Sequence, residues 1–263
     1  MFDGVFIPSV RPDLKDSWHH EQASIDMFEY LLNVNHINLR EYGLSAQDET
    51  FIKEAILGTP KSERTGRGAD KVFMYDIVNN LDSGLDVDKL DYFHRDAKMC
   101  GVGIGGDCDI QRFFHHARVC EVEGELRICY PHKEAQSIMD LFALRFKLHS
   151  KIYTHKVVKS VEFMLTDVLN LVNPYLSFLD SNGNSVRMSH ALHDMAAYSQ
   201  LNDSIKTHIM LQRDPHFDQA KAILDRIAER KLYRCVGRTL LVDHDCKQRR
   251  CPAWCGKTAD EIR

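Results

Sequence analysis

The feature that most constrains the fold is a long helical pattern in the middle of the chain. From Glu134 to Asn173 there is neither proline nor glycine, and Pro174 is the first residue that breaks a helix. Such a stretch forms one or two helices, and the apolar faces of those helices must pack against other elements. The sequence therefore predicts a mainly α fold with this stretch in its core.

Most of the remaining chain shows the same periodicity. Helices are expected over 17–34 with Ser17 as the N-cap, 48–58 ending at Gly58, 71–80 and 86–99, and shorter ones over 190–199, 201–212 and 216–229. The polar segment 59–71 is expected to be a loop. The glycine-rich stretch 101–109 has no strand before it, so a phosphate-cradling loop is not expected there.

One β-hairpin is predicted over 117–130, where "ARVCEVEGELRICY" alternates around Glu123-Gly124. Cys120 and Cys129 then face each other across the strands. A redox-sensitive pair is one interpretation, and two buried thiols are the interpretation we favour.

The overall composition excludes some classes of protein. The formal charge of -4 gives no global electrostatic basis for binding nucleic acid, although the basic stripes below leave weak single-stranded binding as an alternative. No apolar run is long enough to span a membrane. The eight cysteines, with no secretory signal, are expected to be thiols in a reducing compartment.

The stretch "GLDVDKLDYFHRD" places Asp88, Tyr92 and Asp96 on one helix face, with Lys89 at its edge. The pattern alone favours a solvated surface helix. Tyr92 between two carboxylates supports a second interpretation, in which this face is one wall of a site for a charged substrate.

The long helical stretch carries two polar stripes. Arg145, His149 and Tyr153 lie four residues apart, and Lys151 and His155 form a second stripe close to Lys156. An amphipathic helix whose long side chains reach the solvent explains this pattern. So does a nucleotide site, which needs cations for phosphate oxygens and an aromatic ring for sugar or base.

Three weaker motifs contain residue types that bind metals. His193-Asp194, with His190 one turn away, and His244-Asp245 are dipeptides that occur readily by chance. Cys246, Cys251 and Cys255 have no paired C-x-x-C spacing, so a zinc site in the tail is not expected.

Several long motifs agree in series with one known family. "MFDGVFIP", "HEQASIDMFEYL", "GLDVDKLDYFHRD", "ARVCEVEGELRIC", "THKVV" and "HDMAAY" resemble, in order and spacing, the sterile-alpha-motif and HD domain-containing dNTP triphosphohydrolases. The resemblance covers roughly residues 1–238. It implies a mainly α fold, namely an N-terminally truncated HD-superfamily helical domain with a small β-hairpin and a mixed C-terminal lobe. The expected division is 1–170 for the C-terminal portion of the catalytic domain, 171–238 for a helical lobe and 239–263 for a divergent tail.

The resemblance implies cleavage of a dNTP to deoxynucleoside and triphosphate. Asp88 matches a ligand of a divalent metal (Zn, Fe, Mn or Mg), and Asp3, His20 and Glu21 match polar residues near the catalytic histidine. The positions that match substrate contacts are Lys89, Tyr92, Asp96, Arg145, His149 and Tyr153.

The resemblance also implies regulation by nucleotides. GTP and dNTP effectors are expected at seven positions: Arg112, Lys133, Lys151, His155, Lys156, Arg230 and Arg234. Pro131 and His116 replace an arginine and a phenylalanine of the family. A homotetramer in the nucleus, and also in the cytoplasm, that lowers dNTP pools in antiviral defence is implied as well.

One departure bears on activity. In the family, a His, a His-Asp pair and a catalytic His precede "MFDG", and Met1 begins that motif here. One carboxylate does not hold a catalytic divalent ion. The chain alone is therefore expected to hold no metal and to be nearly inactive. The alternative is a non-catalytic regulator that binds nucleotides or assembles with the full-length enzyme.

Overall fold

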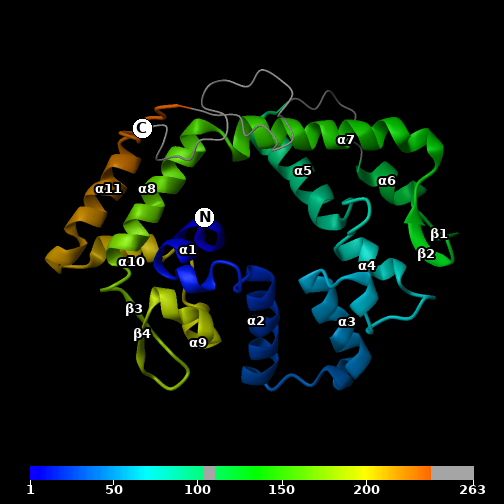
Figure 1. Cartoon of the computed structure of the whole chain (residues 1–263), viewed down its shortest axis with the longest axis horizontal. Coiled ribbons are helices and arrows are strands. Elements are labelled where there is room, and N and C mark those ends of the chain that lie inside the picture. Colours follow the sequence, from blue (N-terminus) through cyan, green and yellow to red (C-terminus); the bar gives the residue numbers. More distant parts are fainter. Residues whose placement is uncertain (103–109, 238–263) are drawn as a thin grey trace, which may run out of the picture. The chain divides into compact units, whose positions relative to one another are not determined.

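The computed structural model describes residues 1–102 and 110–237, which are predominantly helical (Figure 1). The α-helices are α1 (Ile7–Val10), α2 (His20–Val34), α3 (Ala46–Leu57), α4 (Phe73–Val78), α5 (Val87–Cys100), α6 (Ile110–His116), α7 (Ala135–Leu148), α8 (Lys156–Val172), α9 (Met195–Tyr198), α10 (Ile205–Leu211) and α11 (Asp218–Ala228). Two π-helical turns, η1 (Phe2–Phe6) and η6 (His149–Tyr153), and six 3-10 turns, η2 (Pro12–Leu14), η3 (Leu39–Tyr42), η4 (Lys61–Glu63), η5 (His132–Glu134), η7 (Met188–His193) and η8 (Pro215–Phe217), complete the helical elements described. The mainly α prediction is confirmed.

The long uninterrupted stretch forms two helices. α7 passes into the π-helical turn η6, and after Thr154 the chain turns into α8. The His155 side chain begins α8, because its Nδ1 accepts a hydrogen bond from the Val157 backbone N–H at 3.2 Å. The polar residues at 154–155 therefore separate two helices that the periodicity alone leaves continuous.

The core beneath α5 and α7 positions the candidate site. Leucine and phenylalanine side chains from the two helices interlock there, together with residues before α5 and in α6. The buried residues of this core are Leu85, Leu90, Phe93, Ala97, Val102, Phe113, Leu141, Leu144 and Leu148. This packing fixes the α5 face that carries Asp88, Tyr92 and Asp96 relative to the end of α7.

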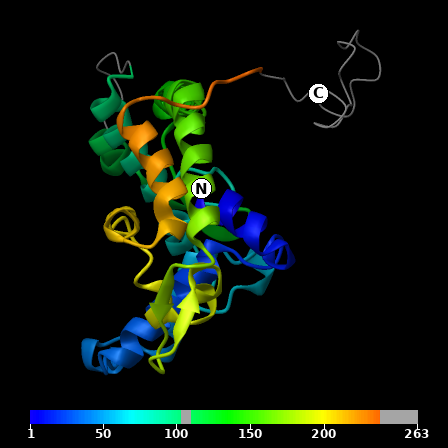
Figure 2. The same ribbon diagram turned by 90° about the vertical axis from the view of Figure 1, so that its left-hand side faces the viewer.

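A second layer is formed by α8 and α11, which lie side by side in both views (Figures 1 and 2). Met164, Val168 and Val172 are buried on α8, and Ala220 and Ile223 are buried on α11. These elements belong to one compact unit, Met1–Leu232, and the described residues of the second unit, which begins at Tyr233, are 233–237. None of the described helices is long and apolar enough to cross a membrane.

The predicted hairpin is present as β1 (Arg118–Val122) and β2 (Glu125–Cys129). Its turn residues Glu123 and Gly124 both have positive φ, as a two-residue hairpin turn requires.

The expectation for the hairpin cysteines was wrong. The register pairs Cys120 with Arg127 and Cys129 with Arg118, and Cys120 is exposed. The two thiols still interact diagonally. Burial, followed by the charge and hydrogen bond of Cys120, raises the pKa of Cys129.

The structure differs from the sequence predictions in three further places. Helix α2 begins at His20 and its N-cap is His19, so Ser17 does not cap it. A second hairpin, β3 (Ser177–Leu179) with β4 (Ser185–Arg187), was missed. Segment 190–199 is the end of η7 followed by the short α9, not one helix. Residues 103–109 of the glycine-rich stretch lie outside the described residues.

Candidate functional site

The first wall of the candidate site is α5, whose start is fixed by Asp86. This buried carboxylate caps the helix, because Oδ1 accepts the Lys89 N–H at 3.1 Å. Its Oδ2 binds the Lys89 ammonium at 2.8 Å. The predicted phosphate-binding lysine is therefore held at the first turn of α5. Sequence reasoning missed Asp86, although an aspartate directly before a helical period is a capping signal.

Tyr153 forms the second wall, at the end of η6. Its hydroxyl donates a 2.5 Å hydrogen bond to Asp96 Oδ2, and its ring centroid lies 6.2 Å from that of Tyr92 in an edge-on arrangement. Arg95 Nε also donates to Asp96 Oδ1 at 3.2 Å. Asp96 thus accepts one hydrogen bond from η6 and one from its own helix α5, and the two tyrosine rings meet edge-on between these elements.

The two tyrosines of this site resist ionisation. Burial, followed by the hydrogen bond to Asp96, raises the pKa of Tyr153. Burial likewise raises the pKa of Tyr92, with the Arg145 charge opposing and the nearby carboxylates adding to the rise. Both phenols therefore remain neutral hydrogen-bond donors well above neutral pH.

The remaining predicted substrate residues lie at the same end of α7. The His149 ring is edge-on to Tyr153 with centroids 5.0 Å apart, and the partly buried Arg145 lies one helical turn earlier, close enough for its charge to act on Tyr92. The structure thus groups Tyr92, Asp96, Arg145, His149 and Tyr153. This arrangement combines a polar aromatic surface with a guanidinium, which suits a sugar linked to a phosphate.

Asp3, His20 and Glu21 form a separate cluster between η1 and α2. The His20 Nδ1 lies 2.7 Å from Asp3 Oδ2 and 3.5 Å from Glu21 Oε2, and the His20 side chain is 64% exposed. Among residues 1–102 and 110–237, no hydrogen bond or ion pair joins this cluster to Tyr153 or Asp96.

The described residues do not fit a divalent metal centre. Asp88 is exposed on α5, and no group of three or more His, Cys, Asp or Glu within the described residues is arranged to hold an ion. Asp194 has a structural role, because its carboxylate caps α9 through the Ala197 N–H and accepts the Ser181 hydroxyl. His244-Asp245 and the three tail cysteines lie outside the described residues.

A third cluster surrounds Glu134, a fully buried carboxylate in η5 that sequence reasoning missed. Arg112 Nε from α6 binds its Oε1 at 3.0 Å, and His116 Nδ1 lies 2.8 Å from the same oxygen. Lys133 Nζ lies 3.2 Å from His116 Nε2. Burial opposes ionisation, yet the hydrogen bond from Arg112 holds the pKa of Glu134 below its usual value. Two predicted effector residues are thus brought together.

The other predicted effector residues lie in separate parts of the chain, outside the Glu134 cluster. Lys151, His155 and Lys156 follow one another between η6 and α8. Arg230 has a left-handed φ of 59° just after α11, and Arg234 belongs to the second unit. Among the described residues, the structure therefore joins Arg112 to Lys133 through Glu134 and His116, and keeps Lys151, His155 and Lys156 as a second local group.

No family model matches the chain. Its sequence is nevertheless clearly similar to part of several individual proteins. It is 42% identical over 249 residues, 91% of its length, to the deoxynucleoside triphosphate triphosphohydrolase SAMHD1 of Homo sapiens. It is 41% identical to SAMHD1 of Danio rerio, again over 91% of the chain, and 32% identical over 83% of the chain to the SAMHD1 homolog of Dictyostelium discoideum. The matches cover 39%, 40% and 38% of those proteins, so the chain spans about two fifths of their length.

Proposed function

We propose, from the premise that this chain is a homologue of the SAMHD1 deoxynucleoside triphosphate triphosphohydrolases, that it supplies the deoxynucleotide-binding wall of such an enzyme. The reaction proposed is cleavage of a dNTP into deoxynucleoside and inorganic triphosphate. The observation that carries the proposal is the hydrogen bond from Tyr153 to Asp96, which fixes an aromatic ring and a carboxylate next to each other.

The site offers different chemistry at its two ends. Tyr92, Tyr153 and Asp96 supply a flat apolar surface with hydrogen-bonding groups, which suits a sugar. Arg145 and Lys89 supply positive charge, which suits phosphate oxygens. A ring packed directly against the sugar leaves no space for a 2′-hydroxyl, so a deoxyribose is favoured over a ribose.

A divalent metal is proposed for the complete family site, with Asp88 as one ligand. The described residues do not complete that ligand set, and the roles above are therefore assigned to this chain's own side chains. What a bound ion supplies in such sites is polarisation of a phosphoryl oxygen or of the attacking water.

The test of the proposed function is equilibrium binding of a non-hydrolysable dGTP to the purified chain, wild type and Asp96→Asn. We expect saturable binding that Asp96→Asn weakens about 10-fold, because a charge-assisted hydrogen bond contributes roughly 1.5–3 kcal/mol. Absence of dNTP binding overturns the proposal. In preparations that hydrolyse dGTP, phosphorus NMR must show inorganic triphosphate, and pyrophosphate or phosphate as the product contradicts the reaction assigned.

The second candidate function is a nucleotide-binding regulator of the full-length enzyme. Arg112 and Lys133 favour it, because the buried Glu134 carboxylate binds Arg112 and lies beside His116, which in turn contacts Lys133. We propose GTP and dNTP as effectors there and at Lys151, His155 and Lys156, with assembly to a homotetramer in the nucleus and a role in antiviral defence. Sedimentation with and without GTP and dNTP tests the assembly, and a sedimentation coefficient that nucleotides leave unchanged contradicts it.

A further inference from the structure

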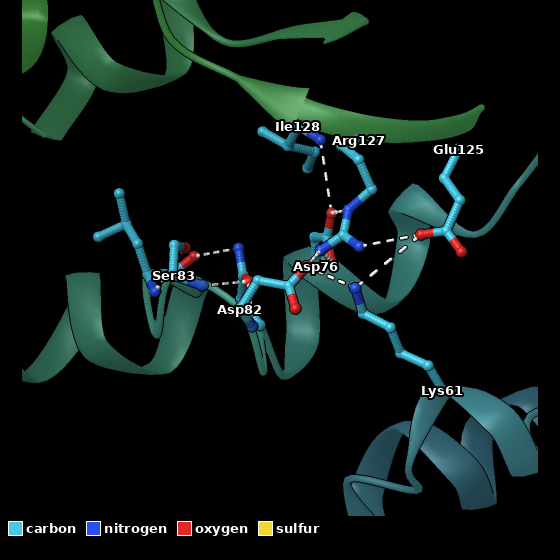
Figure 3. A network of polar contacts seen from close by, with 9 residues as sticks. Lys61, Asp76, Asp82, Ser83, Glu125, Arg127 and Ile128 are labelled. Atoms are coloured by element: carbon cyan, nitrogen blue, oxygen red, sulfur yellow. Dashed lines mark hydrogen bonds and ion pairs between the residues drawn. The ribbon is translucent and has the colours of Figure 1, made fainter. Parts of the chain in front are cut away.

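A set of ion pairs ties the hairpin to α4 and to the turn before α5 (Figure 3). Arg127 on β2 donates Nε to Asp76 Oδ2 at 2.9 Å and Nη2 to Asp76 Oδ1 at 3.0 Å. The Asp76 side chain is buried, at 4% exposure, and the Arg127 side chain is 12% exposed. A two-pronged pair of this kind fixes the orientation of the guanidinium as well as its position.

The same guanidinium reaches Asp82, in the turn between α4 and α5. Asp82 Oδ2 also accepts a 2.7 Å hydrogen bond from the Lys61 ammonium of η4. The Lys61 hydrogen bond, with help from the charge of Arg127, lowers the pKa of Asp82. Asp82 is therefore an ionised carboxylate clamped by two cations, although its side chain is 48% exposed.

From Asp82 the hydrogen bonds continue to the candidate site. The Asp82 N–H donates to Asn80 Oδ1 at 3.1 Å, and Asn80 Nδ2 donates to the Leu85 carbonyl at 3.3 Å. The Asn80 backbone N–H lies 3.4 Å from Asp86 Oδ2, the oxygen that holds the Lys89 ammonium at 2.8 Å. These hydrogen bonds hold the turn between Asp82, which is bound by two cations, and the Lys89 ammonium.

We infer that Asp82 is a positioning residue for the triphosphate end of the site. Clamped by Arg127 and Lys61, it fixes the 79–86 turn, which in turn sets the Asp86 carboxylate and the Lys89 ammonium. The position of the β1–β2 hairpin is thereby linked to the cation that meets the phosphates. The inference rests on the proposed function, because it assigns the phosphate contact to Lys89.

Glu125 provides a matched control. Its carboxylate pairs with the same two cations as Asp82, with Arg127 Nη1 at 3.2 Å and with Lys61 Nζ at 3.9 Å, and its side chain is 47% exposed. It differs in its position, because it lies on the hairpin itself and not in the turn that leads to α5. Loss of its charge removes one carboxylate from the same two cations and leaves the Asp82 contacts of the turn in place.

The experiment compares two ligands across four proteins. Sodium tripolyphosphate and 2′-deoxyguanosine are titrated by NMR into the wild-type chain, Asp82→Asn, Glu125→Gln and Asp82→Asn with Lys89→Ala. We expect Asp82→Asn to weaken tripolyphosphate binding about 5-fold and to leave deoxynucleoside binding within 2-fold, since coupling energies along such networks correspond to factors of about 2 to 30. Glu125→Gln should stay within 2-fold of wild type for both ligands.

The Lys89 background supplies the decisive comparison. If Asp82 acts through Lys89, Asp82→Asn causes no further loss once Lys89→Ala is present. An equal loss for both ligands, equal effects of Asp82→Asn and Glu125→Gln, or an undiminished loss in the Lys89→Ala background each overturns the inference. If the wild-type chain binds neither tripolyphosphate nor a dNTP, the proposed function fails first and the positioning role fails with it. Melting temperatures of all four proteins identify any variant that loses binding by unfolding.

Discussion

The Tyr153 hydroxyl and the Asp96 carboxylate form a 2.5 Å hydrogen bond between residues 57 positions apart in the sequence. The contact joins the π-helical turn η6 to α5. Both elements are held by one core, because Leu90 and Phe93 of α5 pack with Leu144 and Leu148 of α7. The geometry of the proposed deoxynucleotide-binding wall is therefore fixed by the same packing that stabilises the fold.

Gly66 occupies a position without space for a side chain. A Cβ added there would lie 2.5 Å from both the N and Cα atoms of Phe51, which are backbone atoms of α3. Gly66→Ala must therefore displace the loop from the Glu54 carboxylate that accepts its N–H at 2.9 Å. We expect a loss of roughly 1–3 kcal/mol in the free energy of unfolding, as for other overpacked sites, measured by urea denaturation.

Gly68→Ala is the control for Gly66→Ala. A Cβ at Gly68 meets Asp70 Oδ1 at 3.1 Å, and that oxygen is at the end of a flexible side chain. The free energy of unfolding of Gly68→Ala should stay within about 0.5 kcal/mol of the wild-type value. Equal unfolding midpoints for the two alanine variants would show that the loop does not need its close approach to α3.

The Tyr75–Glu54 hydrogen bond predicts a loss of stability in alkaline solution. Burial, followed by that hydrogen bond, raises the pKa of Tyr75 from 10.0 to about 12. A raised folded-state pKa means that the stabilisation is fully present below the unfolded value and is lost as the pH rises through the folded value. Unfolding free energies should fall by about 2–3 kcal/mol between pH 10 and pH 12 from this group.

Tyr75→Phe isolates that contribution, because it removes the ionising hydroxyl and keeps the ring that packs edge-on against Phe51. The variant should show a correspondingly smaller decrease in stability over the same pH range, measured by urea denaturation at each pH. If the free energy of unfolding falls equally steeply with pH in the wild type and in Tyr75→Phe, Tyr75 is not the group responsible.

Arg127→Ala should be strongly destabilising. It leaves the Asp76 carboxylate, 4% exposed, without its two-pronged partner, and an unpaired buried charge costs about 3–5 kcal/mol. Chemical denaturation measures this directly. Replacing both partners, Arg127→Met with Asp76→Leu, should recover much of the loss, because no buried charge then remains. A single variant that costs under about 1 kcal/mol would show that water replaces the guanidinium.

The sequence predicted those elements whose signals are local. The period of four in α5, the glycine that ends α3 and the alternation around Glu123-Gly124 each lie within one element, and the structure has all three. The β3–β4 hairpin was missed because its strands have three residues each, too few for alternation to stand out. Ser17 was assigned as a cap because its residue type suits the role, yet α2 begins three residues later.

For the candidate site, the sequence could predict which residues share a helix face but not which carboxylates hold them. Tyr92 and Asp96 follow from the periodicity of α5, whereas the partner of Arg127 is Asp76, 51 positions away. Glu134 shows no local sign of being fully buried, and the guanidinium that pairs with it, Arg112, lies 22 positions away on α6. Such pairs arise only when distant elements pack, and no period within one element encodes them.

We propose that the Tyr153–Asp96 wall holds a deoxynucleotide. The most direct test is the ratio of affinities for a non-hydrolysable dGTP and the matching GTP, measured for the wild-type chain, Tyr153→Ala and the control Arg112→Ala. Arg112 lies in the separate cluster around Glu134. Arg112→Ala therefore shows how much of the measured affinity comes from nucleotide bound at that cluster. We predict that the wild type and Arg112→Ala prefer the deoxy form at their Tyr153 site by about 10-fold, and that Tyr153→Ala abolishes the preference. Equal affinities for the two nucleotides in the wild type, or a preference that Tyr153→Ala leaves unchanged, would contradict the account.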